Sequence, residues 1–141
     1  MPVERRDVLF TLGEINAVLV RAADKRSDHI PGNLSSMNLI EVMHTRDLST
    51  SFHDQRTRML ALLKEEPKGD GAIFRATKPA AVIGERTFGC FVPDSVMLDA
   101  LLAECTSLKI VLPRRPNKLV IAENLNVGLR FILDDNALEL E

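Results

Sequence analysis

The residues best suited to binding chemistry lie in one short stretch, residues 112–118 (LPRRPNK), in which two arginines stand between two prolines. The prolines restrict the backbone, so a loop of this kind loses little entropy when it binds a ligand. Guanidinium groups donate paired hydrogen bonds to the oxygens of phosphates and carboxylates. The sequence therefore predicts a partner- or anion-binding site formed by Arg114, Arg115, Lys118 and Lys109.

The same stretch also has a purely structural interpretation. A chain that leaves a strand needs a turn, the two prolines provide one, and the arginines would then simply be solvated. Arg75 and Lys78 would enlarge the basic site if the fold placed them beside Arg114 and Arg115. Because the net charge of the whole chain is −2, nucleic-acid binding would depend on such a local patch.

Acidic residues and histidines give weaker signals. Glu41 and His44 have the i, i+3 spacing that places two metal ligands on one face of a helix. No second copy of this pair supplies the remaining ligands, so we expect no metal site and a histidine at the surface. The chain also lacks a glycine-rich phosphate loop and a dinucleotide-binding fingerprint. We therefore expect no catalytic residues and no cofactor.

Length and composition are those of one ordinary globular domain. The chain has 141 residues, of which 45% are hydrophobic and 27% are charged. No apolar run approaches the roughly 18 residues that suggest a membrane span. At the start of the chain, Glu4 and Asp7 interrupt the continuous apolar stretch that a secretory signal would need. We expect a cytoplasmic protein without a membrane partner, in which Cys90 and Cys105 are reduced and buried.

The first half of the chain has mainly helical patterns. A short strand over 8–10 leads into a helix that begins with a capping box at Thr11. Residues 35–43 favour a short helix, although the apolar run at 39–43 would also suit a strand. A further helix is expected over 51–63, where apolar residues recur at helical spacing before a proline and a glycine.

The second half has mainly strand patterns, interrupted by one helix. Asp94 can cap that helix, whose apolar residues recur at helical spacing as far as Cys105. Short β-rich runs with proline and glycine between them are expected to form strands, and the last two should form a hairpin. These runs lie at 72–76, 80–83, 86–92, 108–112, 119–121 and 127–133.

This order of elements predicts an α+β fold with one small, mostly antiparallel sheet and about three to four helices. We expect a single compact domain over 1–141 that is helix-rich over 1–66 and β-rich with one helix over 71–141. A faint internal repeat is visible, because Phe10 and Phe91 each precede a helix that ends near a proline. Few identities align between the two segments, so chance explains this repeat better than duplication.

These observations favour a non-enzymatic regulatory or adaptor domain that acts through protein–protein contacts and self-associates. The chain lacks a catalytic motif, and the edges of its β-rich half need pairing or protection. The first alternative is a small nucleic-acid-binding protein that uses the basic loop at 112–118 and loses affinity steeply with salt. The second alternative is an enzyme of unknown reaction.

Overall fold

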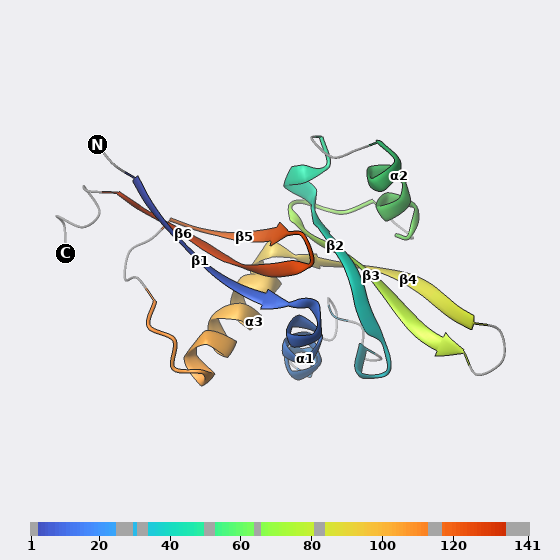
Figure 1. The fold of residues 1–141 in the computed structure, drawn as a ribbon, viewed down its shortest axis with the longest axis horizontal. Helices are drawn as coiled ribbons and strands as arrows, with labels where there is room; N and C mark the ends of the chain where they lie inside the picture. The colour runs from blue at the N-terminus through green and yellow to red at the C-terminus, as the bar shows by residue number, and fades with distance from the viewer. Residues whose placement is uncertain are drawn as a thin grey trace.

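The computed structural model describes residues 3–24, 30, 34–49, 53–63, 66–80, 84–112 and 117–134. These residues form six strands and three α-helices (Figure 1). The strands are β1 (Val3–Thr11), β2 (Asn38–His44), β3 (Gly71–Ala80), β4 (Gly84–Pro93), β5 (Asn117–Glu123) and β6 (Asn126–Asp134), and the helices are α1 (Leu12–Ala23), α2 (His53–Ala61) and α3 (Asp94–Ser107). In this part of the chain, no helix is long and apolar enough to cross a membrane.

The strands form two antiparallel sheets. Sheet A has the order β1-β6-β5, and sheet B has the order β2-β3-β4. Strands β5 and β2 are the edges at which the two sheets contact each other, near the centre of Figure 1. The predicted α+β class is confirmed, but two small sheets replace the single predicted sheet.

One topology occurs twice along the chain. The unit β1-α1-β2-β3 is followed by β4-α3-β5-β6, and the first strand of each unit pairs with the last strand of the other unit. Thr11 at the end of β1 lies opposite Asn126, the first residue of β6, and Pro93 at the end of β4 lies opposite Gly71, the first residue of β3. The two segments of the faint sequence repeat thus lie at two equivalent strand–helix junctions.

Helices α1 and α3 lie against the same face of both sheets, which we call the inner face (Figure 1). One hydrophobic core fills this layer and takes side chains from both helices and both sheets, including Ile15, Leu101, Phe74 and Phe131. Each of these four is at most 1% exposed. The predicted capping box at Thr11 is confirmed, since its side chain accepts from the Glu14 backbone and the Glu14 side chain accepts from the Thr11 backbone.

Helix α2 lies on the opposite face of sheet B, which we call the outer face. Met59 of α2 is fully buried and belongs to a second, smaller core. Met43, Ile73 and Phe91 contribute the sheet side of that core and face one another across the three strands. We call these three residues the sheet B row. Helix α2 is part of the β2–β3 connection, whereas the equivalent β5–β6 connection is a two-residue turn.

The helix expected over 35–43 is wrong, because 38–44 form strand β2. Strand β2 pairs with β3 and is covered on both faces, by α1 on the inner face and by the α2 core on the outer face. A strand covered on both faces carries an almost continuous apolar run, which hides the two-residue alternation of a surface strand. The helical spacing of Met37 and Met43 is therefore coincidental.

The strand expected over 108–112 is also absent. Lys109 has a φ of 58° and ends α3, with its N–H donating to the Thr106 carbonyl and the Ile110 N–H donating to the Cys105 carbonyl. This pair of bonds is a Schellman motif, which satisfies the last carbonyls of the helix and turns the chain away. The predicted C-terminal hairpin is confirmed as β5 and β6. The strand expected over 80–83 falls partly outside the described residues.

Candidate functional site

The outer face of sheet A has a row equivalent to the sheet B row. Leu9, Gly128 and Ile121 face one another across the three strands of sheet A. Ile121 is 4% exposed, but Leu9 is 41% exposed and Leu119, on the same face, is 36% exposed. In the described part of the chain, no helix covers this face as α2 covers sheet B. Sheet A therefore presents apolar side chains to solvent.

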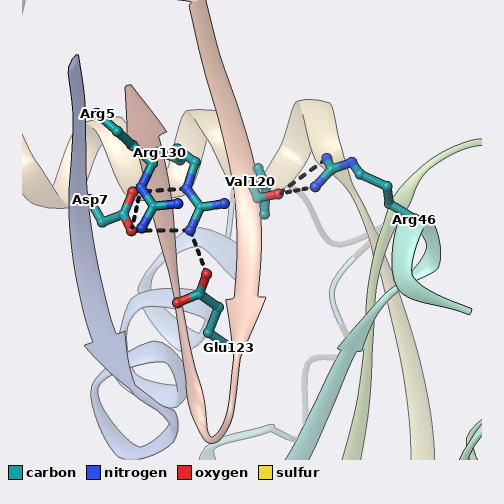
Figure 2. A network of polar contacts seen from close by, with 6 residues as sticks. All are labelled: Arg5, Asp7, Arg46, Val120, Glu123 and Arg130. Atoms are coloured by element: carbon teal, nitrogen blue, oxygen red, sulfur yellow. Dashed lines mark hydrogen bonds and ion pairs between the residues drawn. The ribbon is translucent and has the colours of Figure 1, made fainter. Parts of the chain in front are cut away.

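An ion-pair network crosses the middle of this face (Figure 2). Arg130 donates through Nε to Asp7 Oδ1 at 3.0 Å and through Nη2 to Asp7 Oδ2 at 3.2 Å. The same Nη2 also pairs with Glu123, and Arg5 Nε lies 3.8 Å from Asp7 Oδ2. The hydrogen bond from Arg130 lowers the pKa of Asp7, and its bond to Asp7 raises the pKa of Arg130. Asp7 is thus held ionised near the outer edge of sheet A.

The outer edge of β1 has no strand beside it among the described residues. Thr11 N–H donates to the Glu14 side chain and therefore points away from β6. Backbone groups alternate in direction along an antiparallel strand, so those of Arg5, Asp7 and Leu9 also point away from β6. The side chains of these residues all lie on the outer face.

The edge of β5 is bonded by a side chain that follows β2, and the outer face of β4 is covered at one point by the end of α2. At β5, Arg46 directs Nη1 and Nη2 to the Val120 carbonyl, each at 3.3 Å (Figure 2). At β4, the end of α2 packs against Gly89, where an added Cβ would collide with the side chain and backbone of Leu62. Asp7 holds the position in β1 that Gly89 holds in β4. Sheet A therefore has a carboxylate where sheet B has room for its covering helix.

His44 is buried, not at the surface as predicted, and lies between the two strand–helix units. Its Nδ1 accepts from the Arg46 N–H at 3.0 Å, so its Nε2 carries the proton and donates to Asp94 Oδ1 at 2.8 Å. Both ring nitrogens are occupied and the ring is 0% exposed. The pair thus links the end of β2 to the first residue of α3 and leaves no lone pair for a general base.

The metal-ligand interpretation of Glu41 and His44 fails on geometry. Residues three apart on a strand point to opposite faces, and Glu41 instead pairs with Arg75 at 3.0 Å and with Arg58 of α2 at 2.6 Å. No group of three metal-ligand side chains occurs in the described ranges. Arg75 is therefore charge-paired in sheet B, and Lys78 is an exposed residue of the same strand.

The predicted basic site is described only in part. Arg114 and Arg115 lie outside the described residues. Lys118 is exposed on β5 of sheet A, and Lys109 is exposed at the end of α3, where its backbone forms the Schellman motif. The association of these four residues stays a prediction.

Both cysteines are buried free thiols, as the sequence predicts. Burial raises the pKa of Cys90 to about 11 and is also the main cause of a raised pKa at Cys105. A thiol with a raised pKa has little thiolate at neutral pH and is a poor nucleophile. Neither cysteine therefore has the environment of a reactive group.

Sequence reasoning missed the network of Asp7 and Arg130, whose residues are 123 positions apart. The one usable signal was Arg130 itself, a charged residue within the apolar run of β6 that marks a solvent-facing side. Comparison of this chain with models of known protein families, with curated proteins and with solved structures finds no match.

Proposed function

We propose that this chain is a single-domain, non-enzymatic regulatory or adaptor protein of the cytoplasm that works through protein contacts and associates with itself. The main support for this proposal is that the outer faces of two equivalent sheets are covered differently. Helix α2 covers the sheet B row, whereas the equivalent row of sheet A ends in the exposed Leu9 beside an open strand edge. Exposed apolar side chains next to unpaired backbone groups favour association.

The arrangement of the core supports the single domain. Strands β1 and β4 are exchanged between the two units, and one hydrophobic core takes side chains from both sheets. Neither unit has a complete sheet without the other. Two free, buried cysteines fit a reducing compartment such as the cytoplasm.

The structural bonds of His44 and Glu41 support a non-enzymatic role. His44 uses both ring nitrogens in structural bonds, and Glu41 is shared between two arginines. Catalytic acids and bases need a free proton-accepting or proton-donating position within reach of a substrate. Neither residue has one in this arrangement.

The test is gel filtration with light scattering and a full ultraviolet spectrum across the peak. With no Trp and no Tyr, the chain absorbs little at 280 nm, so a strong band belongs to a bound molecule. We expect a peak without a strong ultraviolet band, at twice the monomer mass of 15.7 kDa. A mass of 15.7 kDa at high concentration would contradict self-association.

The same spectrum tests the two alternatives. A band near 260 nm that nuclease removes would overturn the proposal in favour of nucleic-acid binding through residues 112–118. A similar band that survives nuclease would indicate a bound nucleotide or cofactor and favour an enzyme. Both bands are absent from the spectrum that we expect.

A further inference from the structure

The geometry points to a second copy of this chain as the partner that pairs with the free edge of β1. In this arrangement the two β1 strands run antiparallel, and sheet A continues from one copy into the other. The inference rests on the proposed function and deepens it, because it names the partner, the surface and the register.

The free edge of β1 has an alternating pattern that a second β1 strand can match. Arg5, Asp7 and Leu9 direct their N–H and C=O groups outward, as the Thr11–Glu14 bond establishes. Such a row of unpaired groups is a template for adding a strand from another chain. Arg6, Val8 and Phe10 direct their backbone groups to β6 and take no part in the new ladder.

Charge selects one register for two antiparallel β1 strands. When the two-fold axis passes through Arg6, Arg5 of each copy lies directly opposite Asp7 of the other copy. The Arg5 side chain is 59% exposed and lies 3.8 Å from its own Asp7, so most of its donors remain available. Opposite charges at directly facing positions stabilise a strand pair.

Neighbouring registers lack this complementarity. An axis through Asp7 places the two Asp7 carboxylates opposite each other, and like charges at facing positions are destabilising. An axis through Val8 places Arg5 opposite Thr11, whose N–H is already bonded to Glu14. The register through Arg6 is therefore the one that pairs both charges and uses only free backbone groups.

The chosen register also brings the two Arg6 residues opposite each other on the inner face. Arg6 Nη1 donates to the Val111 carbonyl of its own chain at 2.7 Å. This bond holds each guanidinium at the segment that follows α3 in its own chain.

The equivalent edge of β4 does not offer the same site. Thr87, Gly89 and Phe91 take the places of Arg5, Asp7 and Leu9 in the register. These residues carry no charge pair, and Leu62 at the end of α2 packs against Gly89. Of the two outer edges formed by the described strands, that of β1 is therefore the self-complementary one.

Disulfide trapping tests the register. Facing residues that are not hydrogen-bonded to each other have Cα atoms about 4.5 Å apart, within the bridging range of about 4.4–6.8 Å. We expect Arg6→Cys to form a covalent dimer rapidly under mild oxidation. Leu9→Cys is the matched control on the same strand, because its two thiols lie about 20 Å apart in this register. Equal trapping of both variants, or trapping of Leu9→Cys alone, would overturn the register.

A second pair of variants keeps the test valid if Arg6→Cys does not fold. Arg5→Glu should lower the mass in solution toward that of the monomer, because it places two acidic side chains opposite each other. Lys68→Glu makes the same change of charge at an exposed position before β3, away from this edge, and should keep the mass of the wild type. A dimeric wild type with no loss in Arg5→Glu would refute the β1 edge while leaving self-association intact. A monomeric wild type would refute both.

Discussion

Arg75 and Arg130 occupy the same position in the two sheets, in the middle strand on the outer face. Arg75 pairs with Glu41 on β2, the edge that meets sheet A, whereas Arg130 pairs with Asp7 on β1, the free edge. The Nε–oxygen distance is 3.0 Å in both pairs. Arg130 also pairs with Glu123 on β5, so the feature peculiar to sheet A is the additional carboxylate, Asp7, on the outer edge strand.

Replacing Asp7 by Asn should reduce stability and change its dependence on pH. The pKa of Asp7 is below its ordinary value of 3.8, mainly because of the hydrogen bond from Arg130. Its stabilising effect is therefore complete above about pH 4 and is lost as the pH falls toward the lowered pKa. We expect Asp7→Asn to lose about 1–2 kcal/mol at neutral pH and to show a smaller acid-induced fall than the wild type.

Urea unfolding at neutral and acidic pH measures this effect. Glu123→Gln is the control, because its 48%-exposed carboxylate contributes less to the same network. An Asp7→Asn variant with the same acid-induced fall as the wild type would contradict this account of the network.

Gly128→Ala should destabilise the chain by about 2–3 kcal/mol. A Cβ at this position would overlap the Val8 carbonyl oxygen, so β1 would have to move away from β6. Gly13→Ala is the control and should instead stabilise the chain. A Cβ has open space at this position in the first turn of α1, and alanine is more stable than glycine within a helix by about 0.5–1 kcal/mol. Thermal unfolding of both variants measures the difference, and equal midpoints would be inconsistent with the close approach of β1.

Lys109→Gly should stabilise the chain by about 0.5–1 kcal/mol. Lysine is strained at a φ of 58°, whereas glycine adopts this conformation without penalty. Lys109→Ala removes the same charge but keeps the strain, so it should gain nothing. Urea unfolding distinguishes the two, and a gain of the same size in both variants would attribute the effect to charge.

His44→Phe should cost about 1–3 kcal/mol, because it leaves the Arg46 N–H and the Asp94 carboxylate without their partner. Asp94→Asn keeps an acceptor for the ring and should lose less. Chemical unfolding of the two variants gives the comparison. A stable His44→Phe variant would show that the buried pair does not hold α3 to β2.

The sequence predicts best where the decisive contacts are local. The capping box at Thr11 and the two-residue turn after Glu123 depend on neighbouring residues, and both are present. Strand β2 was missed because helix α2, later in the chain, covers its outer face. The turn at Lys109 was missed because a lysine in the left-handed conformation gives no glycine signal.

The candidate edge could not be predicted for a related reason. The alternation of Arg5, Asp7 and Leu9 is visible in the sequence, but it does not show which side of β1 is paired. That depends on β6, with Asp7 and Arg130 separated by 123 positions. A charged pair becomes a candidate contact only once the exchange of strands leaves β1 at the edge.

Residue-resolved amide hydrogen exchange over a range of protein concentrations tests pairing at the β1 edge most directly. The amides of Arg5, Asp7 and Leu9 point away from β6, so they should exchange slowly only when a second β1 strand accepts their hydrogen bonds. Thr87, the equivalent of Arg5 in β4, is the internal control and should exchange rapidly at all concentrations. We expect protection at Arg5, Asp7 and Leu9 that rises with protein concentration. Rapid exchange at these three amides at high concentration, matching that of Thr87, would contradict the account.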